Sequence, residues 1–273
     1  MEKSTLGIGR KIWFLLLPVL AIALHYSMSG ILLYGFCSFF LDVLHLTQEQ
    51  FAAISGWAEI FVSFVLIFLF FAVYRRVFPR DSKERNVLPD GKKTAMGLIA
   101  GAGVSGVSYL WIMAAKNIPA FQESLLAMET ANQSIESGSA PKLLLTVAIA
   151  APLLEELLFR GIVFRSLEKV LPVWVSIALS ALLFGAYHMN PAQAVYATGM
   201  GIVTGIIYYK TDCLLYPILV HAANNFLGAM QSFIPSKTGT WMIDMACLAM
   251  IIPMGYVIYR LFKHDTTKQA GHF

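Results

Sequence analysis

Residues 151–161 read APLLEELLFRG, and this stretch sets two adjacent carboxylates and an arginine inside a run of strongly apolar residues. The carboxylates are Glu155 and Glu156, and the arginine is Arg160. Ionisable groups in a membrane interior cost several kcal/mol each and generally face a cavity or a partner. If the chain lies in a membrane, these side chains therefore indicate a functional site.

The composition is that of a membrane protein. Of the 273 residues, 58% are hydrophobic and 13% are charged, whereas a soluble domain carries about a quarter charged residues. The mean hydropathy is +0.67. We expect a multi-pass protein of a cell membrane, most simply a bacterial plasma membrane, with the lipid bilayer as its surroundings and no sizeable soluble domain.

About 20 apolar residues suffice for a helix to cross a bilayer, and the chain offers eight such segments. The expected spans are 12–34, 51–74, 95–115, 143–165, 172–189, 192–209, 213–232 and 241–262. This pattern predicts an all-α, polytopic transmembrane helical bundle of about eight spans. We divide it into N-terminal helices and loops (1–142), a core (143–232), and a last span with a cytoplasmic tail (233–273).

The positions of Lys and Arg predict that both termini are cytoplasmic. In that orientation the inner tails and loops hold 16 of these residues, and the outer loops hold 3, namely Lys116, Lys142 and Lys237. Arg160 lies within a span. Removing one span would destroy this asymmetry.

The N-terminal segment, the stretch 117–141 and the cysteines allow weaker interpretations. We interpret the N-terminal apolar segment as a retained span and not as a signal peptide. It extends to about Leu46, either as one long helix or as a span plus an interfacial segment. The outer stretch 117–141 is either an amphipathic helix on the membrane surface or a solvated linker. Cys37, Cys213 and Cys247 form no CxxC pair, and no basic stripe interleaved with aromatic residues favours a nucleic-acid partner.

Three spans carry ionisable groups, each in a pair of residues whose spacing places both members on one helix face. Glu156 and Arg160 form the first pair, while Glu155 points about 100° away from Glu156. The other pairs are Phe184 with His188, in FGAYHMNP, and His221 with Asn225, in HAANN. Asn190-Pro191 is expected to end the helix that carries His188.

The chemistry that suits such a cluster is peptide hydrolysis. A carboxylate in a low-dielectric pocket can act as the general base toward water, and a histidine can share that water. A second histidine and an asparagine can stabilise the oxyanion of the tetrahedral intermediate. A glutamate and two histidines are equally a plausible zinc set.

These segments resemble the motif set of the CPBP intramembrane protease family, the CAAX proteases and bacteriocin-processing enzymes also called Abi or Rce1-like. Its pattern is EExxxR, FxxxH and HxxxN on successive membrane helices, and this chain has EELLFR, FGAYH and HAANN in that order. The likeness covers roughly residues 143–230, and the first three spans add nothing to it.

The resemblance implies an intramembrane (metallo)endopeptidase that cuts a membrane-associated peptide or protein, in some members a lipidated one. By the same resemblance, we expect this chain to act in peptide maturation or in self-immunity to a bacteriocin. The catalytic residues it implies are Glu155 as the base, supported by Glu156 and Arg160, His188 on the water, and His221 and Asn225 on the oxyanion. Members are described both as metalloproteases and as enzymes that activate water without metal. If a divalent metal such as zinc is used, its ligands would be Glu155, His188 and His221.

Rival functions stay open. Ser105 lies in GVSG, as in a rhomboid-type serine protease, although that tetrapeptide sits in a small-residue run typical of helix packing. Buried Glu and His are also what a proton-coupled transporter uses, but no repeat is visible. A membrane scaffold that keeps the fold without the chemistry is the third alternative, and it predicts that Glu155→Ala leaves function intact.

Overall fold

The computed structural model describes residues 6–79, 90–136 and 140–270, and all regular elements in these ranges are helices. They are α1 (Ile8–Ser38) with the π-helical η2 (Phe39–Val43), α2 (Gln48–Val77), α3 (Gly91–Ala115), the 3₁₀ turn η3 (Pro119–Phe121), α4 (Gln122–Glu136), α5 (Ala140–Leu143), the π-helical η4 (Leu144–Ala150), α6 (Ala151–Glu156), the π-helical η5 (Leu157–Phe164), α7 (Arg165–Glu168), α8 (Val173–Tyr187), α9 (Pro191–Thr211), α10 (Leu215–Gln231), α11 (Lys237–Ala249) and α12 (Ile251–Ala270). The predicted all-α class is confirmed.

Each expected span corresponds to a helix or to a run of consecutive helices. Among the described residues, four segments are both long and apolar enough to cross a bilayer, namely Ile8–Val43, Gly56–Val77, Gly91–Ala115 and Lys237–Lys263. Helix α8, at 15 residues, is apolar but shorter. A polytopic helical membrane protein is thus confirmed, while the number of eight crossings and the cytoplasmic placement of both termini stay predictions.

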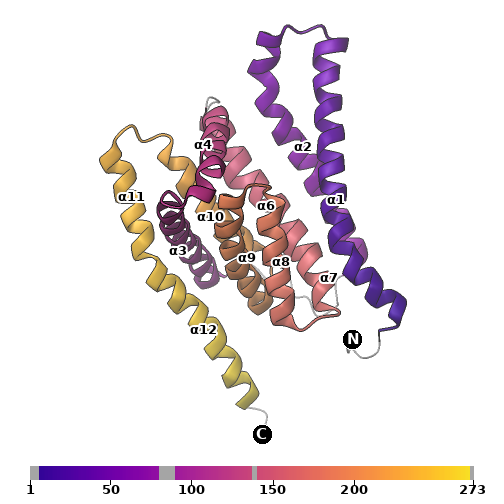
Figure 1. Cartoon of the computed structure of the whole chain (residues 1–273). Helices are drawn as coiled ribbons and strands as arrows, with labels where there is room; N and C mark the ends of the chain where they lie inside the picture. Colours follow the sequence, from indigo (N-terminus) through magenta and orange to yellow (C-terminus); the bar gives the residue numbers. More distant parts are fainter. Residues whose placement is uncertain (1–5, 80–89, 137–139, 271–273) are drawn as a thin grey trace.

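The core of the bundle lies between two outer helix pairs (Figure 1). The hairpin of α1 and α2 flanks one side, and the long rod of α11 and α12 flanks the other. Helix α3 packs against α10, α11 and α12, α8 packs against α9, and α1 contacts η5 and α7. The segments that carry the polar motifs therefore come together in the middle of the molecule.

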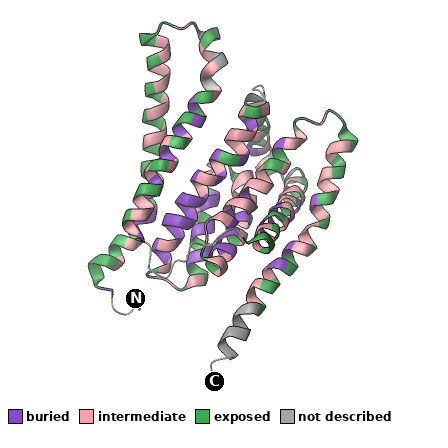
Figure 2. Ribbon diagram, turned by 180° about the vertical axis from the view of Figure 1, so that it is seen from behind, coloured by how far each residue is buried: buried purple, intermediate pink, exposed green. Residues whose placement is uncertain are grey.

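Burial follows this arrangement (Figure 2). All eight residues of η5 are buried, Arg160 included. Large apolar side chains on the outer pairs are exposed instead, such as Tyr34 (76%), Phe68 (77%) and Ile252 (81%). An apolar exterior of this kind suits contact with acyl chains, which need no polar surface.

The first apolar region is one long helix rather than a span plus a separate interfacial segment. Ile8–Val43 is continuous through a π-helical end, and its 36 residues reach roughly 54 Å at 1.5 Å per residue. That exceeds a hydrocarbon core of about 30 Å, so this helix crosses at a tilt or projects beyond the core. Of the two alternatives for the stretch 117–141, a helix or a solvated linker, the structure has a helix, α4, and its place at the membrane surface stays a prediction.

The preceding helix ends just before Asn190-Pro191, as expected, and the pair also begins the next helix. Helix α8 ends at Tyr187, and Met189 adopts a left-handed conformation with φ 54°. Asn190 then caps the next helix, because its side chain accepts a hydrogen bond from the Gln193 N–H at 2.9 Å. Pro191 occupies the first turn of α9, where its missing N–H costs nothing.

Candidate active site

The site is built on the helix run from α5 to α7, where Glu156 and Arg160 form a buried ion pair. The Arg160 Nη1 donates to Glu156 Oε1 at 3.2 Å, and its Nε lies 3.1 Å from Oε2. Both side chains are fully buried, so each charge depends on the other for compensation. The pairing predicted from the i, i+4 spacing is confirmed.

Arg160 is also fixed by the two neighbouring helices. Its Nη2 donates to the Gly201 carbonyl of α9 at 3.1 Å, and its guanidinium lies 4.8 Å from the Phe184 ring centre of α8. A Cβ at position 201 would come within 2.9 Å of Ala181 and 3.3 Å of Arg160 Nη2. Glycine therefore lets the backbone of α9 approach closely enough to accept this hydrogen bond.

His221 lies between the two carboxylates. Its Nδ1 is 2.9 Å from Glu156 Oε1, and its Nε2 is 3.8 Å from Glu155 Oε2. Because an ionised carboxylate only accepts, Nδ1 carries a proton and Nε2 is the nitrogen turned toward Glu155. A single imidazole thus contacts both carboxylates from opposite edges of its ring.

The Oε2 atoms of both carboxylates are buried without a hydrogen bond, but that of Glu156 lies 3.1 Å from Arg160 Nε, whereas that of Glu155 has no cation so close among the described residues. The Glu155 side chain is 15% exposed. The distance of 3.8 Å from its Oε2 to His221 Nε2 is too long for a direct hydrogen bond, so a water would have to lie beside these two atoms and bond to both, not between them. Glu155 is therefore placed to bind a water molecule next to a histidine.

His188 follows the last residue of α8 and approaches the same cluster. Its Nδ1 donates to the Phe184 carbonyl at 3.0 Å, which leaves Nε2 as the acceptor in the neutral ring. His188 interacts electrostatically with Glu155 and His221. The Phe184 ring meets both imidazoles edge to face, at 4.9 Å from the His188 ring and 5.7 Å from the His221 ring.

Asn225 has a structural partner that the sequence did not reveal. Its Nδ2 donates to the Val147 carbonyl of η4 at 2.9 Å. That carbonyl lacks a helical donor because the Ala151 N–H bonds to Thr146 and Pro152 has no N–H. Asn225 thus joins α10 to the helix run, with one N–H of its amide still available.

Ser105 bonds to the neighbour of Asn225. Its hydroxyl donates to Asn224 Oδ1 at 3.1 Å, and Asn224 Nδ2 donates to Asn225 Oδ1 at 3.0 Å. Within the described residues its hydrogen bonds go to Asn224 and not to a histidine. This arrangement gives Ser105 a role in packing α3 against α10 and does not support the serine-protease alternative.

The donor set that the resemblance implies for a metal does not form a metal site. Across 6–79, 90–136 and 140–270, no group of three or more His, Cys, Asp or Glu side chains is arranged to hold an ion. The Nδ1 atoms of His188 and His221 are engaged by protein acceptors, which leaves each Nε2 open and is the usual state of a metal-ligating histidine. What the described residues lack is the grouping of three donor side chains around one point.

The sequence analysis missed three tyrosines near Glu155, namely Tyr26, Tyr187 and Tyr196, and also His25, which contacts Tyr187. The three tyrosines interact electrostatically with Glu155. The Tyr187 hydroxyl lies 3.3 Å from both ring nitrogens of His25. The available signal in the sequence was a histidine inside the first apolar span, His25 in LHYS.

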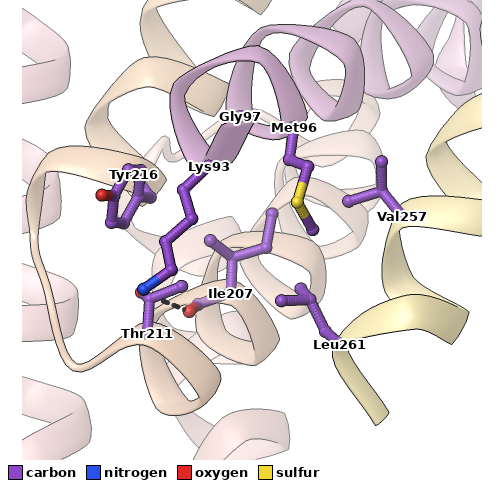
Figure 3. A pocket seen from close by; sticks show the side chains of 8 residues that line it. All are labelled: Lys93, Met96, Gly97, Ile207, Thr211, Tyr216, Val257 and Leu261. Atoms are coloured by element: carbon purple, nitrogen blue, oxygen red, sulfur yellow. Dashed lines mark hydrogen bonds between the residues drawn. The ribbon is translucent and has the colours of Figure 1, made fainter. Parts of the chain in front are cut away.

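Two further hollows lie outside this cluster. An apolar groove of about 540 Å³ runs between α3, η4 and α10, with Leu98, Ile149 and Phe226 on its walls. A much smaller cavity of about 10 Å³ lies between α3, α9, α10 and α12, beside Lys93 and Tyr216 (Figure 3). The latter has room for about one water.

Comparison with known proteins agrees with the motif set. Residues 138–227 match the family model described as type II CAAX prenyl endopeptidase Rce1-like. YdiL of Bacillus subtilis (strain 168), which carries a provisional name as a membrane peptidase, is 25% identical over 184 residues, 62% of this chain and 70% of its own. MroQ of Staphylococcus aureus (strain USA300), named a membrane-embedded CAAX protease, is 29% identical over 91 residues, 31% of this chain and 37% of its own.

An uncharacterized 24.3 kDa protein of Escherichia coli is 36% identical over 93 residues, 32% of this chain and 42% of its own. No solved structure matches the chain. The resemblance to the Rce1-like CAAX proteases is confirmed, and the matched segment contains all seven motif residues, including the six expected to be catalytic. With bacterial membrane proteins among its relatives and several apolar helices, the chain is a multi-pass protein of a cell membrane.

Proposed function

We propose that the protein is an intramembrane endopeptidase that hydrolyses a peptide bond in a membrane-associated peptide or protein. The observation that carries this proposal is the unpaired, buried oxygen of Glu155 at 3.8 Å from His221 Nε2. A buried acceptor without a partner is costly for folding, so its presence points to a ligand that the site is built to hold. The relationship to CAAX proteases makes water attacking a peptide carbonyl the natural candidate.

In the proposed step, Glu155 removes a proton from the bound water as the water oxygen attacks the carbonyl carbon. The His188 Nε2 accepts the hydrogen bond from the other hydrogen of the water and so orients it. The carbonyl π electrons move to oxygen and give a tetrahedral oxyanion. When the C–N bond breaks, Glu155 returns its proton to the leaving amine, and the carboxylate is regenerated.

The oxyanion would be stabilised by His221 and Asn225. Two carboxylates face a single guanidinium in this cluster, so a proton on both nitrogens of His221 makes the group neutral as a whole. Glu156 accepts from Nδ1–H, and Nε2–H is then available for the oxyanion. The free N–H of Asn225 supplies a second donor, while its other N–H holds Val147.

The activity can be tested with purified protein in liposomes and a panel of peptides that carry an apolar anchor next to a cleavable segment. The panel should contain matched peptides with and without a farnesylated cysteine, because the matched family model describes prenyl endopeptidases. Mass spectrometry then identifies the bond that is cut. A wild-type protein that is folded by thermal melt and cuts nothing in the panel would favour the scaffold alternative.

Substitution of either site histidine should lower the cleavage rate, whereas substitution of a histidine outside the site should not. We expect His188→Gln and His221→Gln each to lower kcat by on the order of 100-fold, because one loses the acceptor that orients water and the other the cationic donor. Cleavage rates and melting temperatures of His45→Gln, on the turn between η2 and α2, provide the control. Equal rates in all three variants would remove the histidines from the mechanism.

A further inference from the structure

The turn between α8 and α9 holds His188, and its main chain poses a specific problem. The last carbonyls of a helix have no intrahelical donor. Two of them are satisfied inside the turn, since the His188 N–H bonds to Gly185 at 3.2 Å and the Met189 N–H to Ala186 at 3.1 Å. The Phe184 carbonyl accepts from the His188 ring. The carbonyl of Tyr187 needs a donor from elsewhere.

That donor comes from the opposite end of the chain. The Tyr26 hydroxyl of α1 donates to the Tyr187 carbonyl, across 161 residues of sequence. The two tyrosine rings lie 5.1 Å apart. Helix α1 carries none of the family motifs, but it thus supplies the hydrogen-bond donor for the last carbonyl of α8.

The neighbouring residue of α1 contacts the side chain of Tyr187. His25 is buried, at 6% exposed, and its ring nitrogens lie 3.3 Å from the Tyr187 hydroxyl. The His25 and Tyr187 rings meet edge to face at 5.3 Å. A buried imidazole in an apolar span requires a polar partner, and Tyr187 provides it.

Tyr187 in turn borders the catalytic cluster. Its ring meets that of His188 at 5.5 Å and that of Phe159 in η5 at 5.2 Å, both edge to face. Tyr187 is therefore held by α1 through its carbonyl and hydroxyl, and by η5 through its ring. Any shift of Tyr187 is passed to the next residue, His188.

A second contact secures the far end of the same turn. Ser124 of α4 donates to Asn190 Oδ1 at 2.6 Å, and Asn190 Nδ2 donates back to the Ser124 carbonyl at 2.9 Å. The Ser124 hydroxyl also accepts from the Ala192 N–H at 2.8 Å. The turn is thus fastened on both sides of His188, by α1 before it and by α4 after it.

We infer that His25 and Tyr26 are positioning residues of the site: through Tyr187 they fix the C-terminal end of α8 and hence the orientation of the His188 ring. This inference rests on the proposed function for its catalytic consequence. The orientation of the His188 ring by α1 does not depend on whether the protein is an enzyme.

The kinetic test uses Tyr26→Phe, which removes only the hydroxyl. We expect kcat to fall on the order of tenfold with KM within about twofold, because a misplaced water acceptor slows the chemical step more than binding. Tyr34→Phe is the matched control on the same helix, since Tyr34 is 76% exposed. His25→Gln, which keeps an acceptor for Tyr187, should retain more activity than His25→Leu at the same melting temperature.

A second readout does not require activity. In protein labelled with ¹⁵N-histidine, wild-type His188 should give the NMR signals of the Nδ1–H tautomer, assigned by their loss in His188→Gln. Tyr26→Phe should shift these signals toward a mixture of tautomers, and Tyr34→Phe should leave them unchanged. If wild-type protein cuts no peptide but the His188 signals respond, the proposed function fails and the inference stands.

The inference is overturned if Tyr26→Phe and His25→Leu leave both kcat and the His188 signals as in wild type. It is also overturned if these variants lower the melting temperature and kcat together while the His188 signals stay unchanged, because α1 would then contribute to folding alone.

Discussion

Glu155→Gln is expected to lower kcat/KM for peptide cleavage by about a thousandfold, within the range that general acid–base groups contribute. Glutamine keeps the size and one carbonyl oxygen but cannot take a proton from water. The protein should melt no lower than wild type, because the Oε2 atom of Glu155 has no hydrogen bond to lose. Single-turnover cleavage and thermal unfolding of the same preparation measure both effects.

Glu123→Gln supplies the control for this change. Glu123 is exposed in the first turn of α4 and lies outside the cluster, so the rate should not change, and the melting temperature should fall only slightly because a charge at the helix N-terminus is lost. A Glu155→Gln protein that cleaves as fast as Glu123→Gln would remove Glu155 as the base. The contrast with Glu156 is equally informative, because that carboxylate is engaged by both Arg160 and His221.

Arg160→Met should cause the largest loss of stability. Methionine fills much of the space but leaves the buried Glu156 carboxylate without its cation, a situation that costs about 3–5 kcal/mol of unfolding free energy. The Gly201 carbonyl also loses its donor. Reversible unfolding in mixed micelles, followed by tryptophan fluorescence, measures the change.

The double variant Glu156→Gln, Arg160→Met tests the cause. It removes both charges and keeps an acceptor for His221, so part of the lost stability should return. Arg76→Met, at the exposed C-terminal end of α2, should change stability by less than about 1 kcal/mol. A double variant less stable than Arg160→Met would show that the unpaired charge is not the reason.

Local sequence spacing predicted the parts of the site that lie on one helix. The Glu156–Arg160 pair follows directly from i, i+4 geometry, and the eight apolar segments each correspond to helices. Spacing also placed Glu155 and Glu156 about 100° apart, which suggested that they face different surroundings. It did not show that one imidazole, with nitrogens on opposite edges, contacts both.

The missed contacts depend on partners far along the chain. Nothing within the first span indicates that Tyr26 caps a helix 161 residues later, or that His25 meets the Tyr187 hydroxyl. Asn225 was missed as a structural contact for a different reason. Its acceptor, the Val147 carbonyl, is free only because η4 is π-helical and Pro152 lacks an N–H. Such a change of helix type is not visible in apolar periodicity.

The most direct test of water activation by Glu155 is the fate of the scissile carbonyl in H₂¹⁸O with hydroxylamine present. If Glu155 delivers water to the peptide bond, the new carboxyl group formed in a single turnover carries one ¹⁸O atom and no hydroxamate appears. Glu155→Gln then forms neither the labelled carboxyl group nor a hydroxamate. A hydroxamate at the new C-terminus would contradict this, because it requires an acyl-enzyme on a side chain such as Ser105.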